Sequence, residues 1–181
     1  MRATRDEPVI RLVRPDEFER AGAVTVEAYR HSYGEISTDY AASLADVAGR
    51  VRDGDVWIAD EHGEILGTVW VARAGERLAE VAQPGETDFR QLAVGPAARG
   101  RGVGVALVRH VIALARARGS HRVVLNSGVE MTAAHALYER LGFRRLPERE
   151  RPVEVRPGEW VELLAFGYDV SEAPASSSHD R

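Results

Sequence analysis

Several residue types and segments that often indicate a function are absent from this chain of 181 residues. There is no cysteine, which excludes disulfides, thiolate metal sites and cysteine nucleophiles. There is no lysine either, so all 24 basic residues are arginine, and the P-loop signature ending in Gly-Lys-Ser/Thr cannot be present. No apolar run reaches the length of a membrane span, and the first residues lack the apolar core of a secretory signal. We therefore expect a soluble cytoplasmic protein.

Excess positive charge is also missing, since the formal net charge is −4. This balance argues against broad affinity for nucleic acid or an anionic membrane, and we expect neither as a partner. One local group of arginines could still form a basic patch and leaves nucleic-acid binding as a weaker alternative: Arg140, Arg144, Arg145, Arg149 and Arg151. Three glutamates lie among them, so we interpret the group as a solvated mixed surface. The six histidines show no metal-binding spacing, and no metal site is expected.

Length and composition favour a single domain. With 44% hydrophobic residues, the chain can bury one core, which we assign to residues 9–170. Residues 1–8 are expected to be a flexible N-terminus. Residues 171–181 are short and rich in small residues, so a disordered tail is expected there. A homodimer remains an open possibility.

Hydrophobic periodicity predicts strands alternating with helices. Strands are expected at residues 9–13, 55–60, 65–71, 88–94, 121–126, 143–146 and 160–170, and helices from residue 15, at about 38–50, at 105–118 and at 131–141. Residues 147–159 are interpreted as a polar connection. Helix-turn elements between strands imply an α/β (α+β) fold, in which a mixed central sheet carries helices on both faces.

A glycine-rich turn is the most informative feature of the chain. The predicted strand ending in Leu92-Ala93-Val94 is followed by Arg99-Gly100-Arg101-Gly102-Val103-Gly104 and then by an amphipathic helix. Glycine lets the backbone turn sharply and approach a ligand, and the free N–H groups of the helix's first turn favour an anion. The dinucleotide fingerprint would need a third glycine where Val105 stands. A phosphate or pyrophosphate site is predicted, with a purely structural turn as the alternative.

A second motif lies downstream, on the predicted helix 131–141. Ala134, Leu137, Tyr138 and Leu141 share one face of this helix, and Gly142 stops it. The combination of Arg99-x-x-Gly102-x-Gly104 with Ala134-x-x-Leu137-Tyr138-x-x-x-Gly142-Phe143 resembles the GNAT superfamily of acyl-CoA-dependent N-acetyltransferases. The resemblance is strongest over residues 88–147. It departs from the family at Met131, where an asparagine often helps to hold the cofactor.

This resemblance implies a single-domain GNAT-like fold whose sheet splays open between the strand ending at Val94 and the one ending near Asn126, forming the acyl-CoA cleft. It implies that residues 99–104 grip the pyrophosphate of acetyl-CoA, and that Leu92, Ala93 and Val94 pair with the pantetheine arm. Backbone N–H groups around Ala93 and Val94 would stabilise the oxyanion. The family role of Tyr138 is to protonate the departing thiolate, although a core aromatic at this position is the alternative.

A base must also remove a proton from the amine, directly or through water. Asp88 is the choice here, because strand alternation places it on a defined face, while Glu86, Glu80 and water remain alternatives. In the family, the acceptor pocket is walled by segments equivalent to residues 29–40 and 147–160, whose mixed side chains do not select one amine. The resulting expectation is transfer of an acetyl group to a primary amine of a small molecule or peptide, directly within a ternary complex. A catalytically silent acyl-CoA-binding sensor or interaction module is the alternative.

Overall fold

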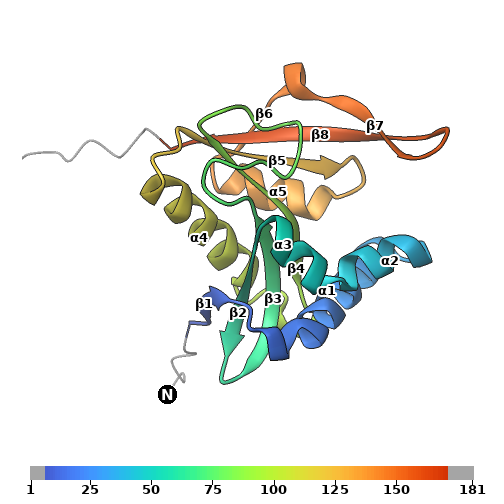
Figure 1. The fold of residues 1–181 in the computed structure, drawn as a ribbon, viewed down its shortest axis with the longest axis vertical. Coiled ribbons are helices and arrows are strands. Elements are labelled where there is room, and N and C mark those ends of the chain that lie inside the picture. The colour runs from blue at the N-terminus through green and yellow to red at the C-terminus, as the bar shows by residue number, and fades with distance from the viewer. Residues whose placement is uncertain (1–6, 171–181) are drawn as a thin grey trace, which may run out of the picture.

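The computed structural model describes residues 7–170, which form one eight-stranded sheet with helices on both faces (Figure 1). Most of the expected flexible N-terminus and the whole expected tail 171–181 lie outside the described residues. The strands are β1 (Val9–Leu12), β2 (Asp55–Glu61), β3 (Glu64–Val71), β4 (Glu86–Val94), β5 (Arg122–Gly128), β6 (Arg144–Arg145), β7 (Arg151–Arg156) and β8 (Glu159–Asp169). Their order is β1-β2-β3-β4-β5-β8-β6, with β7 paired to β8. Among the strand pairs within residues 7–170, only β4–β5 is parallel.

The helices are α1 (Phe18–Tyr33), α2 (Thr38–Ala45), α3 (Val47–Asp53), α4 (Val103–Ala117) and α5 (Thr132–Arg140). Helix α1 packs on β3 and β4 together with α2 and α3, whereas α4 packs on the opposite side of the same strands (Figure 1). The buried face of α4 presents Leu107, Val108 and Val111 to the main core. Burying these helix faces is the main force that joins the layers. The predicted mixed sheet with helices on both faces is therefore confirmed.

The sheet opens between β4 and β5. The two strands pair only over Glu86↔Arg122, Thr87↔Val123 and Asp88↔Val124. Beyond this point β4 continues along β3 to Val94, and β5 continues along β8 to Gly128. A register shift against β3 marks a bulge in β4, where Gln91 has a φ of 52°. Bulges bend the strand that carries them, so this one turns the second half of β4 away from β5. The predicted splayed pair is confirmed.

Two helix boundaries differ from the sequence prediction. The predicted helix 38–50 is two helices, because Asp46 leaves the helical conformation and its carboxylate accepts a hydrogen bond from the Gly49 N–H at 2.8 Å. A side-chain cap of this kind starts a new helix. Helix α1 also runs through Tyr33, beyond the point at which its apolar pattern becomes irregular.

The predicted connection 147–159 contains a strand that periodicity did not reveal. Strand β7 forms a hairpin with β8, and Gly158 in the turn has a φ of 80°. Strand β7 pairs only with β8 and its described side chains are largely exposed, so few apolar residues are needed to hold it. Pro152 lies within it, which is typical of an edge strand. Figure 1 shows this hairpin as a long arm extending past the helices.

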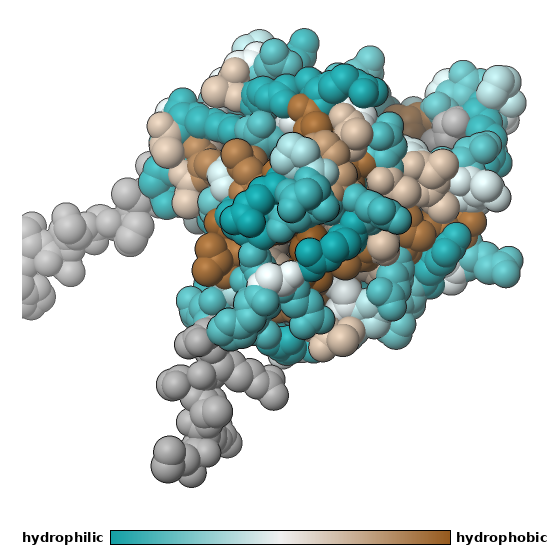
Figure 2. Space-filling model, turned by 60° about the horizontal axis from the view of Figure 1, so that its bottom comes forward, coloured by the Kyte–Doolittle hydropathy of each residue, from teal (hydrophilic) through white to brown (hydrophobic). Residues whose placement is uncertain are grey.

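The surface mixes polar and apolar residues. On the face shown in Figure 2, hydrophilic side chains run between separate groups of apolar ones. The exposed large apolar residues are distributed over several elements: Val9, Leu12, Tyr40, Val129 and Trp160. Within residues 7–170, no helix has both the length and the apolar character needed to cross a membrane.

Candidate active site

The glycine-rich turn joins β4 to α4 at the open end of the sheet. Gly102 is the N-cap of α4 and has a φ of 80°, and Gly100 has a φ of 71°. A Cβ atom at either position would meet nothing within 4 Å, so the outer side of the turn is open. Gly104 differs, because a Cβ there would lie 3.2 Å from Leu137 Cδ2. Backbone conformation therefore requires glycine at position 102, and close packing of α4 against α5 favours it at position 104.

The turn offers a series of free hydrogen-bond donors. Along the chain, the first N–H group of α4 that donates a backbone hydrogen bond is that of Ala106, which donates to the Gly102 carbonyl at 2.9 Å. The backbone N–H groups of residues 100–105 donate to no other residue in the described part of the chain. Such donors at a helix N-terminus, together with the helix dipole, form a favourable site for an anion. The geometry thus fits the phosphate or pyrophosphate site that the motif predicts.

These donors face a cavity of about 470 Å³, the first cavity, between α1, the end of β4 and α5. The sequence-predicted cofactor residues that line it are Leu92, Ala93, Val94, Arg99, Gly100, Gly102, Val103 and Gly104. Arg99 Nη2 also donates to Ser32 Oγ, a second lining residue. Arg101 is the exception, because its guanidinium bonds both carboxylate oxygens of Glu61 at 2.6 Å. Its side chain is thus committed to β2, and only its backbone belongs to the open turn.

A narrow space of about 30 Å³, the throat, adjoins the first cavity at the gap between β4 and β5. Tyr138 lines the throat, as do Gln91 of the bulge and Asn126 of β5. Tyr29, Tyr33, Leu92 and Ala134 line both the throat and the first cavity. The residue that departs from the family motif, Met131, also lines the throat. The structure therefore places the glycine-rich turn and Tyr138 on two neighbouring spaces that share wall residues.

Tyr138 is 5% exposed and packs in an aromatic cluster. Its ring centroid lies 6.0 Å from that of Phe89, 5.8 Å from Phe143 and 5.7 Å from Phe166. Burial, with a smaller contribution from Tyr33, raises the pKa of Tyr138 well above its ordinary value. The phenol is therefore neutral and holds its proton, and its hydroxyl has no hydrogen-bond partner among the described residues. The position of Tyr138 agrees with both interpretations, a core aromatic and a residue of the active site.

Asp88 lies at the closed end of the splay, opposite Val124. It is fully buried, and its Oδ2 accepts hydrogen bonds from the N–H groups of Leu78 and Ala79 at 2.9 and 3.0 Å. Burial outweighs these bonds and raises the pKa of Asp88 to about 6. Such a pKa suits a base, but Asp88 lines neither the throat nor the first cavity. This position counts against the role expected for it and favours a structural one, which is to hold the connection between β3 and β4.

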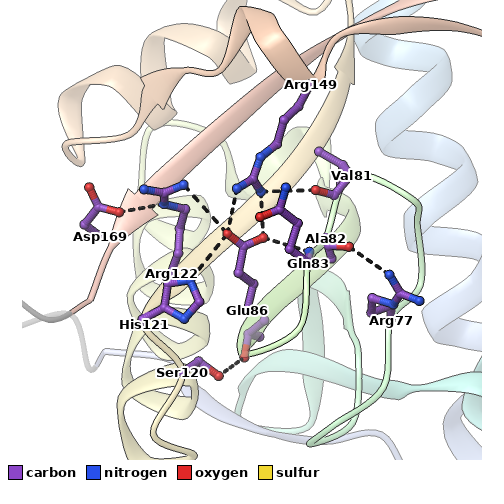
Figure 3. A network of polar contacts seen from close by, with 11 residues as sticks. Arg77, Val81, Ala82, Gln83, Glu86, Ser120, His121, Arg122, Arg149 and Asp169 are labelled. Atoms are coloured by element: carbon purple, nitrogen blue, oxygen red, sulfur yellow. Dashed lines mark hydrogen bonds and ion pairs between the residues drawn. The ribbon is translucent and has the colours of Figure 1, made fainter.

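Glu86 is occupied in a similar way. Figure 3 shows the side chains of Arg149, Arg122 and His121 converging on its buried carboxylate. Arg149 donates to its two oxygens at 2.6 and 2.9 Å. Burial opposes ionisation of Glu86, but the Arg149 guanidinium and the Gln83 N–H outweigh it and lower the pKa. Glu80 is exposed on the β3–β4 connection. The acidic residues proposed from sequence as alternatives to Asp88 are therefore away from the throat.

The predicted arginine patch is mixed with acids, as expected. Arg149 is bound to Glu86, and Arg145 bonds both oxygens of Glu150 at 2.6 and 2.8 Å. Guanidinium groups already paired with carboxylates have less attraction for phosphates. This pairing weakens the nucleic-acid alternative. Among the described residues, no group of three or more His, Asp or Glu side chains is placed to hold a metal ion.

A second cavity of about 560 Å³ lies on the other side of the throat. Helix α2 and the β7–β8 hairpin wall it, through Ser37, Tyr40 and Val153 among others, so segments 29–40 and 147–160 both contribute. Arg90 and Met131 line the second cavity as well as the throat. Glu130 also lines it. Sequence reasoning did not single out Arg90 or Glu130, because isolated charged residues beside a strand carry no periodic or motif signal.

Comparison with known proteins agrees with this geometry. The model of the Acetyltransferase (GNAT) family matches residues 18–143, and the chain belongs to that family. It is 36% identical over 94 residues to N-acetylaspartate synthetase from Danio rerio and 34% identical over 105 residues to mycothiol acetyltransferase from Cellulomonas flavigena. These matches cover 52% and 53% of this chain but only 31% and 30% of the two relatives.

The fold is shared with solved structures. One is a putative acetyltransferase from Salmonella typhimurium, solved with its cofactor acetyl-CoA. The TM-score is 0.63 at 21% sequence identity, and the match covers 96% of this chain and 99% of the other. The two chains therefore share one overall fold.

Proposed function

We propose that this protein is an acetyl-CoA-dependent N-acetyltransferase that acts on a primary amine of a small molecule or peptide by direct transfer within a ternary complex. The observation that carries this proposal is the throat beside Tyr138, which shares wall residues with two cavities of different character. The first cavity carries a row of free backbone donors, and the second is lined by charges of both signs. The two curated relatives are named for different compounds, so the acceptor has to be inferred from this site.

The first cavity fits acetyl-CoA. The free N–H groups of residues 100–105 suit its pyrophosphate, and Arg99 at the rim adds positive charge. Arg101 would contribute through its backbone alone. Beyond Asp88, β4 pairs with no described strand on the β5 side, so backbone groups of residues 92–94 are available to pair with an extended pantetheine arm.

Acetyl-CoA supplies the acetyl group as a thioester, whose sulfur leaves as a thiolate. The buried neutral phenol of Tyr138 donates the proton that this sulfur needs, and the proton released by the amine restores the phenol through water. Backbone N–H groups around Ala93 and Val94 stabilise negative charge on the carbonyl oxygen. The amine proton leaves through water, because the carboxylates of Asp88 and Glu86 are bonded within the fold. Direct transfer is favoured because the chain has no cysteine to carry an acyl group.

Acetyl-CoA is expected to raise the melting temperature of the protein. A ligand that binds only the folded state stabilises it by about 2.7 kcal/mol at a hundredfold excess over its Kd. Thermal melting with and without acetyl-CoA measures this effect, and thiol release in the presence of an amine panel measures turnover. Absence of a shift at saturating acetyl-CoA would rule out the coenzyme site. A shift without turnover of any amine would favour the silent sensor instead.

Asp88→Asn is expected to leave turnover nearly unchanged and to alter the pH dependence of stability. The raised pKa means that Asp88 stabilises the fold most below its unfolded pKa of 3.8, and that this contribution is lost as pH rises through about 6. Asparagine resembles the neutral carboxyl, so the variant should gain up to roughly 3 kcal/mol relative to wild type between about pH 4 and about pH 7. Denaturant unfolding and thiol release at several pH values test both statements. A loss of turnover above about pH 6, where the wild-type carboxylate is ionised, would restore Asp88 as the base.

A further inference from the structure

The second cavity contains two charged side chains of opposite sign that no neighbour within residues 7–170 neutralises. Its other charges are matched, since Arg156 lies 3.7 Å from Asp39 and 3.4 Å from Glu159. Arg90 and Glu130 have no ion-pair partner among residues 7–170 and are both exposed to the cavity. An unmatched guanidinium and an unmatched carboxylate in one cavity suit a ligand that itself carries both charges.

One of the two groups lines the throat, and the other is adjacent in sequence to a residue that does. Arg90 is on β4, immediately before the bulge, and lines the throat and the second cavity. Glu130 follows β5, next to Met131, which also lines both. Its carboxylate rests against Gly128, where a Cβ atom would come within 2.9 Å of Glu130 Oε1. The missing side chain of Gly128 thus leaves the space in which this carboxylate sits.

Tyr40 lies in the second cavity with both charges and senses each of them. Burial raises the pKa of Tyr40, the nearby Arg90 lowers it, and the nearby Glu130 raises it. Tyr40 also lines the second cavity and packs edge-on against Tyr29, with ring centroids 5.9 Å apart. Arg90, Tyr40 and Glu130 therefore all line the second cavity, and Arg90 lines the throat as well.

We propose that the acetyl acceptor is a free amino acid or a similarly small amino-carboxylate, with Arg90 binding its carboxylate and Glu130 its ammonium group. Arginine suits the first task because its planar fork can donate two parallel hydrogen bonds to a carboxylate. A polyamine would place a second cation beside Arg90, and the N-terminus of a peptide carries no carboxylate next to its amine. This assignment rests on the proposed N-acetyltransferase function and specifies its substrate class.

The first test uses the wild-type protein with acetyl-CoA. Thiol release is measured with the proteinogenic amino acids, and the best substrate is then compared with its own primary amide. We expect kcat/KM to be roughly ten- to a hundredfold higher for the acid, as for loss of a hydrogen-bonded charge. Amidation lowers the pKa of the amine and favours its reactive neutral form, so a preference for the acid reports recognition of the carboxylate. Equal or faster turnover of the amide would overturn the proposal.

The second test removes each charge. Arg90→Gln should raise KM for the amino acid and abolish the preference over the amide, while changing the amide itself little. Glu130→Gln should weaken both substrates to a similar degree, because both keep the ammonium group. Arg109→Gln is the matched control, since Arg109 is an exposed arginine on α4 that lines none of the three spaces. An Arg90→Gln variant that keeps the full preference would contradict the assignment.

The outcomes separate this proposal from the function on which it rests. If acetyl-CoA gives no melting shift, the proposed function fails and the substrate class falls with it. If acetyl-CoA binds and other amines are acetylated, but no free amino-carboxylate is, only the substrate class is wrong. Turnover of an amino acid with loss of its preference in Arg90→Gln supports both.

Discussion

Replacing Tyr138 by phenylalanine is expected to lower turnover by about a hundredfold or more, as for loss of a general acid. The substitution removes one hydroxyl and keeps the ring that packs against Phe89, Phe143 and Phe166. Because the hydroxyl bonds to no described residue, its removal leaves no unpaired partner in the core. Stability and acetyl-CoA binding should therefore stay close to wild type, and the loss should fall on kcat rather than KM if binding precedes chemistry.

Tyr168→Phe provides a matched control for this experiment. Tyr168 belongs to the same aromatic cluster, with its ring centroid 5.4 Å from that of Phe143, but it lines neither cavity nor the throat. Thiol release and melting temperature are measured on both variants. A kinetic loss confined to Tyr138→Phe supports proton donation to the sulfur. Normal turnover by Tyr138→Phe would mean that Tyr138 is a core aromatic without a catalytic role.

The parts of the site that sequence alone predicts are those set by local chemistry. Gly102 occupies a left-handed N-cap, a conformation that glycine adopts at little cost, so a glycine before an amphipathic helix carried the signal. The face shared by Ala134, Leu137 and Tyr138 follows from helical period, and these residues do line the site. The mixed sheet with helices on both of its faces was likewise predicted from hydrophobic periodicity.

The parts that sequence did not predict depend on irregular segments and distant partners. Alternation along the strand assigned Asp88 to one face of the sheet. The hydrogen-bond partners of its carboxylate, however, come from the connection at residues 78–79, which has no periodicity. Arg101 lies in the motif, yet its side chain pairs with Glu61, 40 positions earlier. Strand β7 was missed because an exposed edge strand needs little apolar alternation. Contacts of this kind are set by packing of the whole chain, which no local pattern records.

Replacing Gly102 by valine is expected to abolish the melting shift produced by acetyl-CoA. A β-branched residue disfavours the left-handed φ of 80° found there, so the turn must rearrange or store strain. Rearrangement would disperse the donors of residues 100–105, and a side chain would project into the open space on their outer side. Both effects oppose close approach of a pyrophosphate. Thermal melting of the variant, with and without acetyl-CoA, measures the outcome.

Loss of stability alone could imitate part of this result, and Gly63→Val controls for it. Gly63 has a φ of 85° in the β2–β3 turn, and a Cβ atom there would also meet nothing within 4 Å. Valine should therefore impose similar backbone strain at a site outside the first cavity. We expect Gly63→Val to melt at a lower temperature but to keep the full acetyl-CoA shift, whereas Gly102→Val loses the shift. A normal shift in a folded Gly102→Val protein would mean that the turn shapes the chain without binding the coenzyme.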